Sequence, residues 1–218
     1  MPKAESIKSF INKLIQRHQN GTPHGTCVAV QPGRGMRSRN SQCGFTLIEL
    51  LIVVAIIGII AAIAVPGLLR ARMAGNEASA IGSLRAINSA NLNYQTNCAN
   101  GSGYAPSLVI LGTPPLAANG GGQPFISPDL GVATPIVKAG YSIDYTSSNA
   151  LAAAAVCNGA AVAVAGNYLA TGAPVSAGTS GTRFFGTSEA QTVFQHSAAI
   201  TAIDAAGVPT PNAAVAIK

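Results

Sequence analysis

The sequence contains few of the groups that usually carry catalysis. It has only 7 acidic residues, 3 His and 4 Cys among 218 residues, and charged residues of both signs make up 9% of the chain. No Ser/His/Asp or Cys/His combination has the spacing of a nucleophilic site. We therefore expect no enzymatic activity and no cofactor.

Patterns for metal and phosphate binding are missing too. The histidines are scattered along the chain, at His18, His24 and His196. Together with the cysteines they form no spaced zinc-binding set. Asp129 and Asp144 lack clustered oxygen ligands, so we expect solvated carboxylates rather than a Ca²⁺ site. The run Gly120–Gly122 lacks the Lys-Ser/Thr pair of a phosphate-binding loop, and we expect a flexible turn there.

One long hydrophobic run is present. From Phe45 to Ala64 the chain is nearly all Leu, Ile, Val and Ala, with Glu49 as the single carboxylate. As a helix this run is roughly 30 Å long, which is the hydrocarbon thickness of a bilayer. The sequence therefore predicts one membrane crossing.

Basic residues gather ahead of this run. Residues 1–44 carry seven Lys and Arg against one acid, Glu5, whereas only Arg70 and Arg72 closely follow the run. This bias predicts a cytoplasmic N-terminus. Residues 45–218 balance six basic with six acidic residues, so the whole formal net charge of +6 belongs to residues 1–44. The charge therefore argues for membrane topology, and no nucleic acid is required as a partner.

The hydrophobic run opens with a motif. Gly44 is followed by FTLIELLIVV, residues 45–54, which places Phe45 directly after the glycine and a Glu four residues later. This stretch resembles the processing and assembly signature that type IV prepilins share with the pseudopilins of type II secretion. The resemblance implies that a membrane aspartyl prepilin peptidase cuts between Gly44 and Phe45, removes the basic leader 1–44 and N-methylates Phe45.

The order of segments excludes two other processing routes. In a secretory signal peptide the small-residue cleavage site follows the apolar segment, and here the short polar motif precedes it. A lipoprotein interpretation based on Cys43 fails for the same reason. The leader is longer than those typical of prepilins that begin with Phe, so translation from Met36 is an alternative to a start at Met1.

Glu49 needs a partner, because a carboxylate at a helix centre in lipid costs about 2.5–3.5 kcal/mol, and less near a helix end. Cleavage creates an α-amine at Phe45, which can pair with Glu49 of a neighbouring subunit in a helical bundle. At about 4 Å such a pair gains roughly 4 kcal/mol with an effective dielectric constant near 20, but desolvation offsets most of it. We expect the pair to fix register more than it adds strength. The alternative is an unpaired Glu49 that snorkels to the interface.

The periodicity predicts one long helix from Phe45 to about Thr96, with a kink at Pro66. Its first part, 45–66, is apolar all round and suits a membrane or a filament core, while 67–97 is amphipathic and suits packing on a soluble domain. The stripe expected to pack comprises Leu69, Met73, Ala80, Ile81, Leu84, Ile87 and Asn91. The charged residues expected to face elsewhere are Arg70, Arg72, Glu77 and Arg85.

Residues 98–139 are rich in Pro and Gly and read as a connecting loop. From 140 to 218 the pattern predicts antiparallel strands joined by Gly- and Ser-rich turns. The expected strands are Tyr141–Thr146, Ala161–Thr171, Thr182–Gly186 and Thr192–His196. The run Leu151–Val156 is ambiguous between helix and strand. The predicted fold class is α+β, with one long N-terminal helix packed on a sheet of about four strands, an arrangement that resembles the pilin domain.

Cys98 and Cys157 are the two cysteines that remain after removal of the leader. The predicted topology places both in an oxidising compartment, so we expect a disulfide between them. Two buried free thiols are the alternative.

The resemblance implies a structural subunit of a type IV pilus, polymerised with itself through its hydrophobic helix. Before assembly it is expected to cross the inner membrane once, in contact with lipid, and afterwards to lie in a surface pilus or a periplasmic filament. The implied partners are prepilin peptidase, an inner-membrane platform protein, an assembly ATPase and a secretin. A pseudopilin of type II secretion is the alternative, and a single-pass membrane-anchored binding protein is a third reading that leaves Glu49 unexplained.

Overall fold

The structure of the chain is a computed structural model that describes residues 45–117, 121–159, 161–204, 209–211 and 213–217. The chain divides into two compact units, residues 1–49 and 50–218, and of the first unit only residues 45–49 are described. The predictions made for the leader, including Met36, Cys43 and Gly44, lie outside the described residues.

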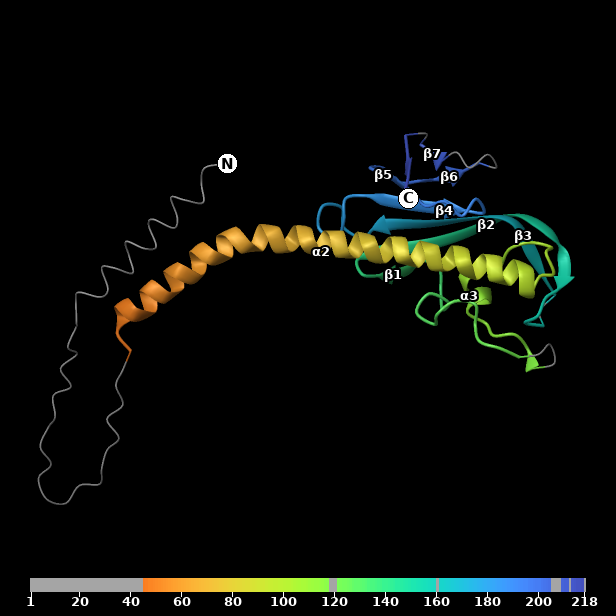
Figure 1. The fold of residues 1–218 in the computed structure, drawn as a ribbon, viewed down its shortest axis with the longest axis horizontal. Coiled ribbons are helices and arrows are strands. Elements are labelled where there is room, and N and C mark those ends of the chain that lie inside the picture. The colour runs from red at the N-terminus through yellow and green to blue at the C-terminus, as the bar shows by residue number, and fades with distance from the viewer. Residues whose placement is uncertain (1–44, 118–120, 160, 205–208, 212, 218) are drawn as a thin grey trace, which may run out of the picture. The chain divides into compact units, whose positions relative to one another are not determined.

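Helix α2 runs from Leu47 to Asn97 and contains 51 residues. Its bounds match the helix predicted from Phe45 to about Thr96. The helix passes through Pro66 without interruption (Figure 1). The flanking residues Val65 and Gly67 are poor helix formers, but Ala, Ile and Leu lie on both sides of them, and the proline removes only one hydrogen-bond donor. The predicted kink at this position stays a prediction.

The C-terminal part of the chain forms a six-stranded sheet in which every described pairing is antiparallel, in the order β1-β2-β3-β4-β5-β8. Its strands are β1 (Ile136–Lys138), β2 (Tyr141–Ala155), β3 (Ala161–Pro174), β4 (Phe184–Ser188), β5 (Phe194–His196) and β8 (Val215–Ala216). A separate pair is formed by β6 (Ala202–Ile203) and β7 (Pro209–Thr210). The four predicted strands correspond to β2, β3, β4 and β5.

The β2–β3 hairpin is longer than the sequence indicated. The two strands pair from Tyr141 opposite Pro174 to Ala155 opposite Ala161, with an irregularity between Ala150 and Ala153. The ambiguous run Leu151–Val156 therefore belongs to a strand as far as Ala155. Figure 1 shows this hairpin extending along the C-terminal half of α2, past the ends of its neighbours.

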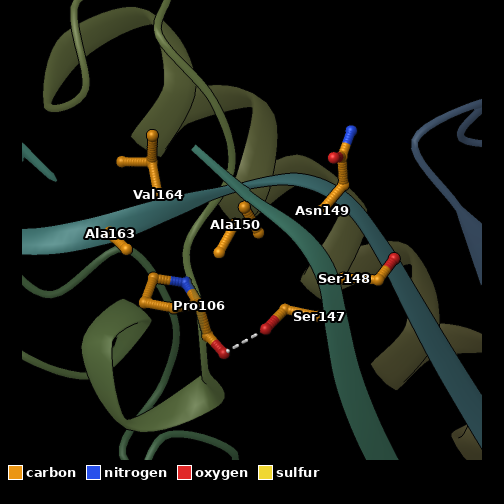
Figure 2. Close-up of a pocket in the computed structure, with 8 residues that line it drawn as sticks. Pro106, Ser147, Ser148, Asn149, Ala150, Ala163 and Val164 are labelled. Carbon is orange, nitrogen blue, oxygen red and sulfur yellow. Dashed lines mark hydrogen bonds between the residues drawn. The ribbon is translucent and has the colours of Figure 1, made fainter. Parts of the chain in front are cut away.

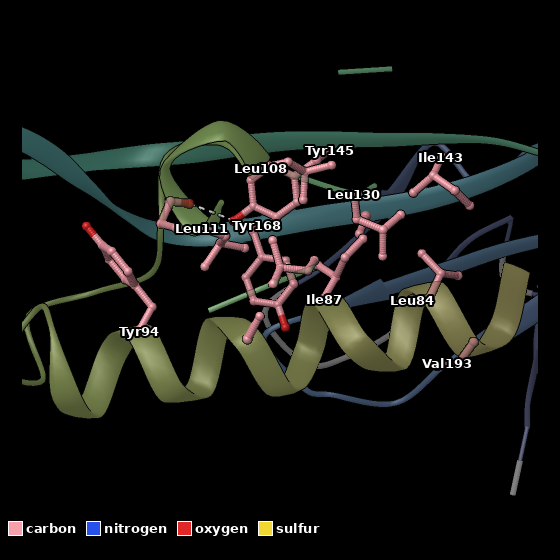
Figure 3. Close-up of a cluster of buried hydrophobic side chains, with 14 of the residues drawn as sticks. Leu84, Ile87, Tyr94, Leu108, Leu111, Leu130, Ile143, Tyr145, Tyr168 and Val193 are labelled. Atoms are coloured by element: carbon pink, nitrogen blue, oxygen red, sulfur yellow. Dashed lines mark hydrogen bonds between the residues drawn. The ribbon is translucent and has the colours of Figure 1, made fainter. Parts of the chain in front are cut away.

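The core lies between one face of α2 and the sheet (Figure 3). The helix contributes Ala80, Leu84, Ile87, Ala90 and Tyr94, all nearly inaccessible to solvent. The strands contribute Tyr141, Ile143, Tyr145, Tyr168 and Phe185. The alternation of buried and more exposed residues in the first part of β2 is the pattern of a strand with one face packed. This arrangement is the predicted α+β fold, with the long helix packed on an antiparallel sheet.

The segment 98–139 is more than a connecting loop. It contains the short helix α3 (Leu108–Leu111), whose N-cap is Ser107, and it ends in strand β1. Its buried apolar residues belong to the same core, on the side of α2 that faces the strands (Figure 3). They are Ala105, Leu108, Leu111, Ile126 and Leu130. The sequence reading placed no element here because these residues are separated by Pro and Gly and show no period.

Candidate assembly site

The first half of α2 is an apolar surface. The large hydrophobic side chains from Phe45, just before the helix, to Leu69 are 44–86% exposed. By length and composition α2 is the one helix among the described residues that can cross a membrane. An exposed apolar patch of this size requires a lipid or protein environment. The helix thus presents a binding surface to a bilayer or to other helices.

Glu49 lies in the first turn of α2 and forms a reciprocal cap with Thr46. The Thr46 N–H donates to Glu49 Oε2 at 3.0 Å, and Thr46 Oγ1 donates to the same oxygen at 2.7 Å. The Glu49 N–H donates to Thr46 Oγ1 at 3.3 Å. This is a capping box, in which an N-cap Thr and a Glu three residues later satisfy each other's free amides. The sequence Thr-x-x-Glu ahead of an apolar run is its signal, which the sequence reading missed.

The capping box leaves half of the carboxylate available. Both bonds from Thr46 reach Oε2, and Oε1 has no hydrogen-bond partner in the part of the chain that the structure describes. A carboxylate has about four lone-pair sites and accepts several donors at once. Glu49 can therefore keep its cap and still accept a charged donor from another chain.

The second half of α2 fastens this apolar surface to the domain. Glu77 is only 6% exposed, and its Oε1 accepts from the Thr182 N–H at 3.0 Å. Its Oε2 accepts from Arg183 Nε at 2.8 Å and from Nη2 at 2.5 Å. One residue earlier, Asn76 Nδ2 donates to the Ser180 carbonyl at 2.9 Å. The expectation that Glu77 faces away from the domain is wrong, because Thr182 and Arg183 supply a charged and hydrogen-bonded partner for it.

These contacts set the protonation state of Glu77. Burial raises the pKa of its carboxyl, but the Thr182 amide and the Arg183 guanidinium outweigh burial and hold the pKa below its ordinary value of 4.5. The unfolded chain therefore takes up the proton at higher pH than the folded chain does. The stabilisation from this group is complete above about pH 4.5 and is lost as the pH falls through the lower, folded-state pKa.

We expect Arg183→Ala to lower the free energy of unfolding at pH 7 by about 2 kcal/mol, because it leaves a buried carboxylate without its charged partner. Arg85→Ala is the matched control. Arg85 is exposed on α2, the helix that carries Glu77, and its side chain forms no hydrogen bond within the described residues. Its removal should therefore change the free energy of unfolding by less than about 0.5 kcal/mol. Denaturant titration of the detergent-solubilised protein at pH 7 and pH 3.5 measures both effects. A variant lacking Arg183 that matches wild type at pH 7 would contradict this role.

Two buried amides continue the attachment along the helix. Asn88 Nδ2 donates to Thr187 Oγ1 at 2.8 Å, and Asn88 Oδ1 accepts from Tyr168 Oη at 3.1 Å. Asn91 Oδ1 accepts from the Ala105 N–H at 3.3 Å and from Tyr145 Oη at 3.2 Å. Burial raises the pKa of both tyrosines, so their hydroxyls remain donors. The sequence pattern placed Asn91 on the packed stripe but gave no sign of these partners.

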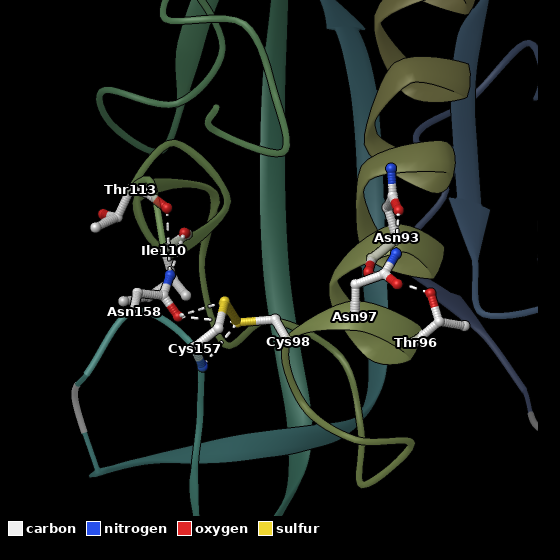
Figure 4. The surroundings of a disulfide bond; sticks show 8 residues. All are labelled: Asn93, Thr96, Asn97, Cys98, Ile110, Thr113, Cys157 and Asn158. Carbon is white, nitrogen blue, oxygen red and sulfur yellow. Dashed lines mark hydrogen bonds between the residues drawn. A yellow bond between two sulfur atoms is a disulfide. The ribbon is translucent and has the colours of Figure 1, made fainter. Parts of the chain in front are cut away.

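Cys98 and Cys157 form the predicted disulfide, which joins the end of α2 to the end of the β2–β3 hairpin (Figure 4). The Cys157 N–H donates to the Cys98 carbonyl at 3.3 Å, and the Leu116 N–H donates to the Cys157 carbonyl at 3.0 Å. Asn158 Nδ2 donates to the Ile110 carbonyl at 3.1 Å. Helix, hairpin and the segment after α3 are thus tied together at one point.

The remaining candidates form no site in the described residues. Asp129 bonds Lys138, and Asp144 Oδ1 accepts from the Tyr145 N–H at 2.8 Å. The described part of the chain has no cluster of His, Cys, Asp and Glu that could hold a metal. Gly120 lies outside the described residues, as does Gly44, so the cleavage site and the methylation of Phe45 stay predictions.

Comparison with known proteins finds similarity at the N-terminal end. Residues 39–65 match the family described as the prokaryotic N-terminal methylation motif. A 69-residue stretch is 42% identical to the type IV major pilin protein PilA of Myxococcus xanthus (strain DK1622), covering 29% of this chain and 31% of that protein. The match thus spans less than a third of the relative's length. No solved structure matches the chain.

Proposed function

We propose that this type IV prepilin-like chain is the structural subunit of a type IV pilus. The observation that carries the proposal is the exposed apolar half of α2, which directly precedes a folded domain and contains Glu49 as its single carboxylate. Before assembly the bilayer covers this surface, with the N-terminus cytoplasmic and the domain on the far side of the inner membrane. After assembly the helices of other subunits cover it.

Proteolytic processing leads from the membrane-bound subunit to the assembled subunit. Prepilin peptidase cuts the Gly44–Phe45 bond and methylates the new amine, which stays positively charged. That amine approaches Oε1 of Glu49 in a neighbouring subunit while Thr46 holds Oε2. Because desolvation offsets most of the Coulomb gain, the pair sets the stagger between helices, and the apolar contacts supply the affinity.

The remaining partners follow from this cycle. A platform protein and an assembly ATPase in the inner membrane extract the subunit from lipid, and a secretin passes the filament through the outer membrane. The subunit itself is structural and needs neither cofactor nor nucleic acid. The similarity to a protein named as a major pilin favours a pilus over a type II secretion pseudopilus, which shares the same N-terminal motif.

Mass spectrometry of sheared surface filaments tests this function. We expect the intact mass of a chain that begins at N-methylated Phe45 and retains one disulfide. A subunit found only in membrane fractions, processed in the same way, would assign the chain to a pseudopilus. An unprocessed chain in cells that contain the peptidase would contradict both assignments.

A further inference from the structure

Strand β2 has a long edge with no partner strand. On one side it pairs with β3 from Tyr141 to Ala155. On the other side β1 pairs only with residues 141–143. From Asp144 onward, β2 has one neighbouring strand among the described residues.

The ladder geometry shows which backbone groups are free. The N–H and C=O of Ala165 in β3 both bond Tyr104, at 2.9 and 2.8 Å, so they point away from β2. Two residues that lie opposite each other in an antiparallel pair either both point their N–H and C=O groups toward the partner strand or both point them away from it. Ala150, which lies opposite Ala165, therefore turns its N–H and C=O outward. Ser148, Thr146 and Asp144 follow at two-residue steps and also turn their N–H and C=O groups outward.

These outward groups are accessible. Residues 146–150 are all exposed, and within the described residues no backbone–backbone hydrogen bond other than those to β3 involves residues 144–151. Natural sheets protect such edges with lysine, proline or a covering segment. Asp144, at the start of the free edge, is charged, but residues 145–155 contain no charged residue and no proline, so the rest of the edge lacks both kinds of protecting residue.

The same sheet ends in a second open edge at β8. Val215 and Ala216 pair with Gln195 and Phe194 of β5, no other described strand pairs with them, and Val215 is 59% exposed. Residues 213–217 carry no charge. The two open edges of one molecule therefore belong to different strands. When the β8 edge of one copy approaches the β2 edge of another, no like charges face each other.

We propose that β8 of a second copy of this chain adds to the free edge of β2, between Asp144 and Ala150, so that the sheet continues from one subunit to the next. Backbone hydrogen bonds supply this contact, as in other cases of strand addition. Because the two edges differ, the contact is heterologous, and repetition yields an open helical polymer rather than a closed dimer. The inference rests on the proposed filament function and adds a contact outside the helices.

The face of the β2–β3 hairpin is hollowed next to this edge. A cavity of about 440 Å³ is lined by residues 147–150 and 163–165 and by Pro106. Figure 2 shows Ser147 donating to the Pro106 carbonyl, a 2.9 Å bond that fixes one wall of the cavity. The lining has no charged residue, so the hairpin face next to the edge presents no charge to an incoming strand.

A cysteine pair tests the contact in assembled filaments. Ser148→Cys with Val215→Cys places one thiol on each edge, while Cys98 and Cys157 are unreactive in their disulfide. A short bismaleimide crosslinker should convert most subunits of the double variant into a ladder of dimers, trimers and higher multiples on a denaturing gel. Each single variant should remain monomeric.

Thr171→Cys with Val215→Cys is the matched control, because Thr171 lies one strand further in, opposite Asp144. It should give no ladder. Filaments of the test pair without a ladder, equal ladders from the control, or dimers from Ser148→Cys alone would each overturn the edge contact. Absence of filaments from the wild type would instead contradict the proposed function.

Discussion

Glu49→Gln should abolish surface filaments, reducing their yield by at least a factor of about ten, while leaving mature subunit in the membrane. Glutamine at this position keeps the capping box with Thr46. It removes the negative charge that we propose receives the Phe45 amine, so an incoming subunit should leave that amine buried and unpaired. Shearing cells and comparing filament with membrane-bound subunit measures the effect.

Thr46→Ala tests whether filament formation depends on the charge of Glu49 or on its role in the helix cap. It removes the hydroxyl that bonds Glu49 Oε2 and accepts the Glu49 N–H, at a cost of about 1 kcal/mol, but keeps the carboxylate. Filament yield should stay within a factor of about two of wild type. Loss of filaments in Thr46→Ala, with normal yield in Glu49→Gln, would show that Glu49 serves only the helix cap.

Removing the disulfide should have the second large effect. Cys98→Ala with Cys157→Ala opens a loop with a sequence separation of 59. In the chain-entropy model this lowers the free energy of unfolding by about 4 kcal/mol, a large part of the stability of a domain this size. Urea titration of the solubilised protein should show a much lower midpoint, and filament yield should fall with it.

Reduction provides the control for this experiment. A reducing agent should lower the midpoint of the wild type toward that of the double variant and leave the variant unchanged. Equal midpoints for oxidised wild type and variant would show that packing alone holds the hairpin to the end of α2.

The sequence predicted the elements with strong periodicity. The 51 residues of α2 and the four longest strands after residue 140 carry patterns that repeat often enough to recognise. Strands β6, β7 and β8 have two residues each, too few for any period. Between Ala105 and Leu130 the one apolar run, Leu108–Leu111, is too short for a helical period and the other buried residues stand apart, so only tertiary packing shows that they belong to the core.

The attachment of α2 to the domain could not be predicted, because its bonding partners lie far away in the sequence. Glu77 was expected on the exposed side because a charged residue on an amphipathic helix usually faces solvent. Its partner Arg183 lies 106 residues away, and no local pattern signals such a pair. The Thr46–Glu49 cap is different, since its signature lies within four residues and is readable from sequence.

The part of α2 that packs on the domain is attached at both of its ends, and these two attachments determine how the subunit bears mechanical load. In the proposed filament, tension would enter each domain through the helix, which is held near its middle by the bonds of Glu77 and at its end by the Cys98–Cys157 bond. Noncovalent bonds yield first under shear, but the helix end stays covalently joined to the hairpin. Sliding of α2 along the sheet would therefore stop at the disulfide, so a stretched subunit should recover its packing once the force is released.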